Sequence, residues 1–203
     1  GLGDVYKRQF VTDGFYSTDE EAAGVDNSDI WGGKWLAGDV RYKNLNGDKT
    51  ADGKDIISKG HSKLQDPGDR KIIGNNTARY NYGISLSAEY KNFDFSCLMQ
   101  GVGKRDLMLG GAYFWGFTDE WRTPTTEQLD YWTPDNPNAY YPRQRFGGGG
   151  NFQSQTKYLQ NGAYMRMKQL TLGYSIPKAL LSKVRINSLR FYFTAVSYTH
   201  LTL

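Results

Sequence analysis

Residues 44–55 contain the pattern in this sequence that is closest to a metal site. A calcium loop of about 12 residues supplies side-chain oxygens from positions 1, 3, 5, 9 and 12, and a backbone carbonyl from position 7. The spacing makes this segment a candidate Ca²⁺ loop. The candidate ligands are Asn44, Asn46, Asp48, Thr50 (through its carbonyl), Asp52 and Asp55.

The same segment departs from the calcium pattern, and a turn without metal is the alternative. Position 1 is Asn44, and position 6, where Gly normally allows a sharp turn, is Lys49. Position 8 is Ala51, and Asp55 at position 12 reaches less far than the usual bidentate Glu. Clusters of Asn, Asp and Gly are also typical of ordinary turns.

The sequence contains no set of side chains with the spacing of a catalytic site. The histidines are His61 and His200, and the single cysteine, Cys97, allows neither a zinc cluster nor a disulfide within the chain. Asp119 and Glu120 could in principle serve a glycosidase, but adjacent acids in a loop usually face solvent. We therefore expect that the chain is not an enzyme, and a hydrolase is the least favoured interpretation.

Residues 102–161 form a long segment without sustained periodicity and with many aromatic side chains. Loops of this length are usually functional or disordered, and the aromatic content argues against disorder. Aromatic rings can stack on sugars or cover a ligand, but they can equally pack on one another. The candidate substrate-binding residues are Trp115, Trp121, Tyr131 and Trp132.

Residues 80–101 form the clearest strands that could position these loops. Apolar and polar residues alternate with a period of two, which predicts strands with one apolar and one polar face. The tight turn at Lys91 and Asn92 predicts antiparallel pairing. A membrane barrel and a soluble sandwich would both show this alternation. The apolar phase carries Tyr82, Ile84, Leu86, Ala88, Tyr90, Phe93, Phe95, Cys97 and Met99.

Further strand patterns follow at residues 158–174 and 188–195. A change of phase near Lys168 predicts a β-bulge, and Pro177 predicts the start of a short helix over residues 177–184. Residues 17–29 are expected to form a solvated loop, and residues 31–35 a small aromatic cluster. Short connections alternate with long ones, as in outer-membrane barrels, whereas a sandwich has no reason to sort its loops in this way.

The composition limits the class of protein. In 203 residues the hydrophobic content is 38%, and no run approaches the roughly 18 apolar residues of a membrane helix, which excludes a helical membrane bundle. The net charge of +4 comes from interspersed residues without a Lys/Arg block, so no nucleic-acid partner is expected.

Several segments, taken in order, resemble the SusC/RagA-like TonB-dependent outer-membrane transporters. These segments are residues 10–15 (FVTDGF), 38–48 (GDVRYKNLNGD), 73–75 (IGN), 82–94 (YGISLSAEYKNFD), 100–101 (QG), 132–139 (WTPDNPNA), 141–143 (YPR), 164–174 (YMRMKQLTLGY), Pro177 and 189–190 (LR). The resemblance implies an all-β fold, a partial antiparallel transmembrane β-barrel with long extracellular loops, taken from the C-terminal part of a larger barrel. The calcium-like loop resembles a dockerin loop of that family.

The resemblance also implies a function. Members import oligosaccharides, and in some cases peptides, across the outer membrane of Gram-negative, Bacteroidetes-type bacteria. Their partners would be a SusD-like surface lipoprotein, the TonB complex, outer-membrane lipid and the glycan or peptide substrate. The plug and N-terminal parts would lie outside this chain. Residues 1–9 and 196–203 resemble adapter-derived, non-native sequence, which leaves residues 10–195 as the barrel segment.

A soluble, secreted carbohydrate-binding β-domain with a calcium loop is the main alternative. A sandwich would bury Leu86 and Phe95 against a second sheet, whereas a barrel segment would leave their face uncovered. The position of these two side chains therefore separates the two interpretations.

Overall fold

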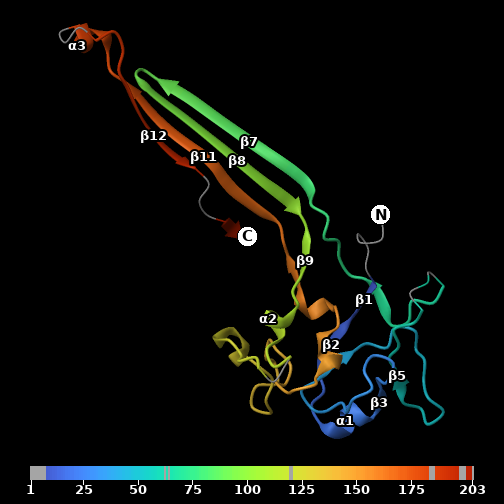
Figure 1. The fold of residues 1–203 in the computed structure, drawn as a ribbon. Helices are drawn as coiled ribbons and strands as arrows, with labels where there is room; N and C mark the ends of the chain where they lie inside the picture. The colour runs from blue at the N-terminus through green and yellow to red at the C-terminus, as the bar shows by residue number, and fades with distance from the viewer. Residues whose placement is uncertain are drawn as a thin grey trace. The chain divides into compact units, whose positions relative to one another are not determined.

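The computed structural model describes residues 8–61, 63, 65–118, 121–182, 186–196 and 200–202 (Figure 1). The chain divides into two compact units. We call Gly1–Asn75 with Leu107–Gln160 the loop unit, and Asn76–Asp106 with Asn161–Leu203 the sheet unit. Among the described residues, no helix has both the length and the apolar character needed to cross a membrane.

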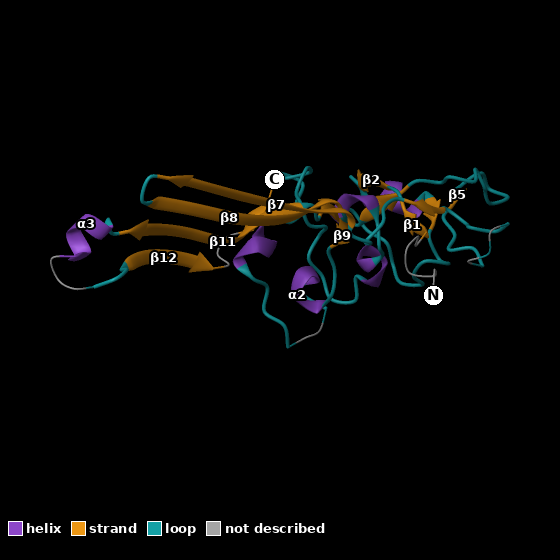
Figure 2. Cartoon of the chain, turned by 90° about the horizontal axis from the view of Figure 1, so that it is seen from above, coloured by secondary structure: helices purple, strands orange, loops and turns teal. Residues whose placement is uncertain are grey.

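The sheet unit is built from long antiparallel strands in the order β12-β11-β8-β7, with β13 also paired to β11 (Figure 2). These strands run in a single layer, and β7 and β12 are its edges in the described part of the chain. The elements are β7 (Arg79–Tyr90), β8 (Phe93–Lys104), β11 (Tyr164–Ser175), α3 (Lys178–Leu181), β12 (Arg190–Val196) and β13 (His200–Thr202).

The strand register gathers the apolar phase on one face of this sheet. Leu86 pairs with Cys97, which pairs with Leu170, so one apolar row crosses three strands. The next row places Phe95 beside Leu172. Leu86 is 48% exposed and Phe95 is half-buried, whereas the buried hydrophobic cluster of the described residues lies wholly in the loop unit. The apolar face is therefore uncovered, as a barrel segment requires and a sandwich does not.

Local features of the sheet also agree with the sequence pattern. The register of β11 against β8 shifts between Met167 and Gln169, which confirms the predicted bulge. Tyr90 pairs with Phe93 across the predicted two-residue turn, in which Lys91 has a φ of +56°. The predicted short helix is confirmed as α3, which begins after Pro177. Residues 183–185 of that prediction lie outside the described residues.

The opposite face of the sheet carries mainly polar side chains, and an ion pair crosses a strand there. Arg190 Nε donates to Asp94 Oδ1 at 3.1 Å, and a second guanidinium nitrogen bonds the other carboxylate oxygen. Gly173 lies between them in the register of β11, and a Cβ at this position would come within 2.3 Å of Asp94 Oδ1. Glycine at position 173 therefore leaves the space that this ion pair occupies.

The loop unit consists of short elements joined by ordered loops. Pairing is antiparallel for β1 with β6 and for β2 with β4, and parallel for β3 with β5. The elements are β1 (Arg8–Phe10), β2 (Thr12–Phe15), α1 (Asp19–Ala23), β3 (Val25–Asp26), β4 (Val40–Tyr42), β5 (Asp55–Ile56), β6 (Arg70–Ile72), β9 (Asp106–Met108), α2 (Ala112–Trp115) and β10 (Leu159–Asn161), with 3₁₀ turns at Thr126–Leu129, Gly149–Phe152 and Thr156–Tyr158.

The two long connecting segments, residues 17–77 and 102–161, share one hydrophobic core. The predicted aromatic cluster at residues 31–35 is confirmed, because Trp35 packs edge-on against Trp31, Tyr16 and Tyr42. Trp132 reaches the same core from the second segment. The full cluster is Phe10, Phe15, Tyr16, Ala22, Ile30, Trp35, Val40, Tyr42, Ile57, Trp132 and Ala139.

The expectation of a solvated loop at residues 17–29 is wrong. Thr18 caps α1 by accepting a hydrogen bond from the Glu21 amide, and the Glu21 carboxylate accepts one from the Ser17 amide. Ala22 and Asn27 are buried. The pattern Thr-x-x-Glu is a known helix-start signal, so the start of this helix could have been predicted from the sequence.

A buried polar network joins the two segments that form the core. Asp39 is fully buried and accepts hydrogen bonds from the Leu36 amide (2.8 Å), Asn151 Nδ2 (2.9 Å) and the guanidinium of Arg145. Asn151 Oδ1 in turn accepts from the Val40 amide at 2.8 Å. Because every oxygen of this buried carboxylate is engaged, the network fixes residues 36–40 against residues 145–151.

The proposed non-native ends are only partly covered by the described residues. Residues 1–7, 197–199 and 203 lie outside them. Arg8 and Gln9 form β1 with Phe10, and Val196 is the last residue of β12. The boundaries at residues 9 and 196 stay a prediction.

Candidate functional site

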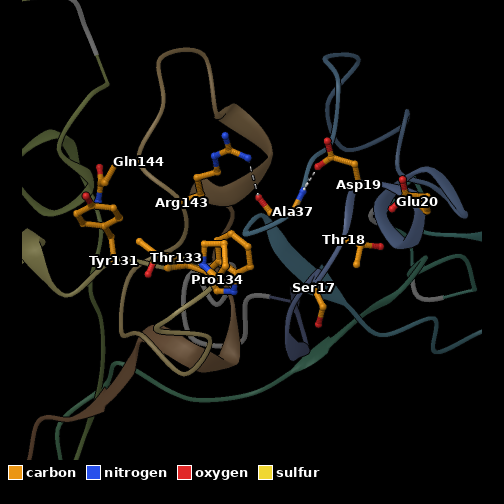
Figure 3. A pocket seen from close by; sticks show the side chains of 11 residues that line it. Ser17, Thr18, Asp19, Glu20, Ala37, Tyr131, Thr133, Pro134, Arg143 and Gln144 are labelled. Carbon is orange, nitrogen blue, oxygen red and sulfur yellow. Dashed lines mark hydrogen bonds between the residues drawn. The ribbon is translucent and has the colours of Figure 1, made fainter.

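The loop unit contains an open pocket of about 610 Å³ that includes two of the predicted substrate-binding residues, Tyr131 and Trp132 (Figure 3). Two stretches from the first long segment and two from the second form its walls. The lining residues are Ser17, Thr18, Asp19, Glu20, Ala37, Tyr131, Trp132, Thr133, Pro134, Arg143 and Gln144.

One wall of the pocket carries two carboxylates from the first turn of α1. Asp19 Oδ1 accepts a hydrogen bond from the Ala37 amide at 2.8 Å, which fixes this side chain at the wall. Glu20 is exposed, and its side chain has no hydrogen-bond partner among the described residues. Thr18 holds the start of α1, so the position of both acids follows from the helix cap.

The other wall carries Arg143, Gln144 and the half-buried ring of Tyr131. The Arg143 amide donates to the Gly38 carbonyl at 2.9 Å, and its guanidinium makes a long contact of 3.5 Å with the Ala37 carbonyl. Arg143 and Asp19 therefore both contact the backbone of Ala37, as Figure 3 shows. Among the ion pairs of the described residues, none joins Arg143 to either acid.

The ring of Trp132, which lines the pocket, packs closely against Gly38. Trp132 is 6% exposed, and its amide donates to the Tyr141 carbonyl at 2.9 Å. Gly38 has a φ of +85°, and a Cβ there would lie 2.4 Å from Trp132 Cε3. Both the backbone conformation and the close ring thus require glycine at this position.

The structure separates the four predicted substrate-binding residues. Trp115 is only 6% exposed and packs at 4.8 Å from the ring of Tyr158 and 5.2 Å from that of Phe152. Trp121 is 93% exposed and does not line the pocket. The structure brings Tyr131 and Trp132 together at the pocket. Contact with substrate stays a prediction for all four residues, Trp115, Trp121, Tyr131 and Trp132.

Buried tyrosines around the core act as hydrogen-bonding groups. Burial raises the pKa of Tyr16 to about 12, which the hydrogen bond from Asn27 Nδ2 only partly offsets. Burial also raises the pKa of Tyr42 and that of Tyr158 well above the usual value. These phenols stay protonated at neutral pH, and Tyr42 donates to the Gly150 carbonyl at 2.8 Å.

The predicted calcium ligands are engaged in a hydrogen-bonded turn. Asn44 Oδ1 accepts from the Gly47 amide at 2.6 Å, and Asp55 Oδ1 lies 3.3 Å from Lys49 Nζ. Within the described part of the chain, no three His, Cys, Asp or Glu side chains converge as a metal site would require. The arrangement offers no preformed acidic cage, and calcium at residues 44–55 stays a prediction that these contacts do not favour.

Asp69, which is not among the residues predicted from the sequence, fixes this turn by accepting hydrogen bonds from its backbone. Asp69 is fully buried, and its carboxylate accepts from the amides of Leu45 (2.6 Å), Asn46 (3.2 Å) and Ser58 (2.8 Å). Three backbone donors on one buried carboxylate tie both ends of residues 45–58 together.

We expect Asp69→Ala to loosen this turn, because three backbone amides lose their buried acceptor. The local cost is about 2 kcal/mol or more. Hydrogen exchange of the amides of residues 45, 46 and 58 measures it, and exchange should accelerate by at least about tenfold. Asp52→Ala, an exposed acid in the same turn, serves as the control. Equal exchange in the two variants would contradict this role.

Comparison with known proteins identifies relatives of the chain. No protein-family model matches it. TonB-dependent receptor P3 of Formosa agariphila is 30% identical over 132 residues, which are 61% of this chain and 12% of the receptor. TonB-dependent receptor P26 of the same organism is 24% identical over 189 residues, 91% of this chain and 17% of the receptor. The chain is a relative of the TonB-dependent receptors.

Solved structures agree with this relationship at the level of the fold. The RagAB peptide importer in its open-open state matches 98% of this chain and 19% of its own, with a TM-score of 0.58 and 19% identity. The RagAB peptide transporter matches with a TM-score of 0.60 and 18% identity over 97% of this chain and 19% of its own. The predicted resemblance is confirmed, and so is the predicted fold class, an antiparallel all-β fold like that of the matched barrel proteins.

This relative of the TonB-dependent receptors spans less than a fifth of the proteins that it matches. The matched proteins are named as receptors, an importer and a transporter. Sequence reasoning missed the charged and amide residues of the pocket, Asp19, Glu20, Arg143 and Gln144. The cap formed by Thr18 and Glu21 could have placed the two acids on an ordered element.

Proposed function

We propose that this chain is part of an outer-membrane, TonB-dependent importer of oligosaccharides or peptides in a Gram-negative bacterium. The sheet unit would supply barrel wall, and the loop unit would form part of the extracellular surface that meets substrate. The uncovered apolar face of β7, β8, β11 and β12 carries this proposal, because such a face in water would promote aggregation.

The relatives support the same role for the complete protein. We infer that residues 10–195 are a segment of a larger barrel and that the two ends outside it are non-native. The partners of the complete protein would be a SusD-like surface lipoprotein, which would cover the substrate, and the TonB complex, which would power import. On this proposal the chain has no enzymatic activity of its own. A lipoprotein gene beside the chain's gene would support the partner assignment.

Two neighbouring positions on β7 test the orientation of the sheet in a membrane. In a Cys97→Ala background, the full chain would carry one spin label, at Leu86→Cys or at Ser87→Cys, in phosphatidylcholine vesicles. Leu86 lies in the apolar phase and Ser87 in the polar phase, so the two labels point to opposite faces. The label at position 86 should be relaxed mainly by oxygen dissolved in lipid, and the label at position 87 by a water-soluble nickel complex. Equal access of the nickel complex to both labels would contradict the proposal.

A further inference from the structure

We propose that the pocket between Asp19, Glu20 and Arg143 binds a short zwitterionic peptide through its charged groups. This inference rests on the proposed import function and names a substrate class for one site of it. The pocket of about 610 Å³ lies within the range of about 300–1,000 Å³ that is usual for small-ligand sites.

Opposite charges on the two walls carry the inference. Within the described part of the chain, Glu20 and the second oxygen of Asp19 have no hydrogen-bond partner, so they can accept hydrogen bonds from an ammonium group. Arg143 is exposed, and among the described residues its guanidinium makes only the long contact with Ala37, so it can pair with a carboxylate. An arginine fork and a carboxylate match in geometry, and charge-assisted hydrogen bonds are stronger than neutral ones.

The remaining lining groups suit the backbone of a peptide. Gln144 offers both a donor and an acceptor, and Thr133 offers a hydroxyl group. Tyr131 and Pro134 give apolar surface for a side chain. An extended tripeptide spans at most about 10 Å, so its two ends could reach opposite sides of such a pocket.

A neutral sugar would match this pocket less well. It would cover two carboxylates and a guanidinium without neutralising them, and desolvated charges that lack a partner are costly. A ligand with one positive and one negative group pairs with the guanidinium and with one of the two carboxylates. Complementary charge also favours the correct orientation of the ligand over the reversed one.

Calorimetric titration of the full chain in detergent tests the proposal with three probes: triglycine, N-acetyl-triglycine amide and maltotriose. We expect triglycine to bind at least about tenfold more tightly than the blocked peptide, which lacks both charges, and more tightly than maltotriose. This comparison uses the unaltered chain, so it does not depend on the folding of any variant.

Charge-removing variants then assign the two ends of the ligand. Glu20→Gln and Arg143→Gln should each weaken triglycine binding by at least about fivefold and leave the blocked peptide unaffected. Glu127→Gln and Lys71→Gln remove exposed charges of the same unit outside the pocket and should change nothing. Equal binding of free and blocked peptide, preference for maltotriose, or no binding of triglycine would overturn the proposal. None of these results would affect the lipid-facing test of β7.

Discussion

Asp39→Ala is expected to destabilise the loop unit by about 3–5 kcal/mol, the usual cost of removing one partner from a buried ion pair. The substitution leaves the largely buried guanidinium of Arg145 without its counter-charge. It also removes the acceptor of the Leu36 amide and of Asn151 Nδ2. Urea unfolding followed by tryptophan fluorescence measures the loss, because Trp31 and Trp35 lie beside this network.

A surface carboxylate provides the matched control for Asp39. Asp13 is half-exposed and lies near Lys43 (3.3 Å) and Arg41 (3.8 Å), and exposed pairs of this kind contribute less than about 1 kcal/mol. The double variant Asp39→Ala with Arg145→Ala should recover part of the loss, since no buried charge is stranded. If Asp39→Ala cost no more than Asp13→Ala, the network would not hold the two segments together.

Leu86→Arg is expected to destabilise the sheet unit in phospholipid vesicles by about 2–4 kcal/mol, as arginine does near the bilayer midplane on the lipid face of a barrel. Leu86 lies in the middle of β7, in a row of apolar residues that continues through Cys97 and Leu170. The free energy of unfolding in urea, measured in the presence of vesicles, gives the effect.

Ser87→Arg is the control for this effect, because it adds the same charge one residue further along the same strand. Ser87 pairs with Ser96 on the polar face, where an arginine can stay hydrated. Its cost should stay below about 1 kcal/mol. Similar losses at positions 86 and 87 would mean that neither face of this sheet meets lipid.

The sequence by itself determined where the strands of the sheet unit lie and which of their side chains share the apolar face. Alternation with a period of two depends only on neighbouring residues, so the apolar phase of residues 80–101 could be assigned without any knowledge of the fold. The turn at Lys91, the bulge beside Lys168 and the helix after Pro177 are local for the same reason, and the structure contains all three.

Only the tertiary structure shows how the two long connecting segments pack against each other. The ion pair of Asp39 with Arg145 joins residues 106 positions apart, and the hydrogen bond from Asn151 to Asp39 joins residues 112 apart. No local spacing encodes such contacts, because loop residues have no periodicity that fixes their partners. The same long-range packing brought Asp19 and Glu20 of one segment opposite Arg143 of the other and so formed the pocket.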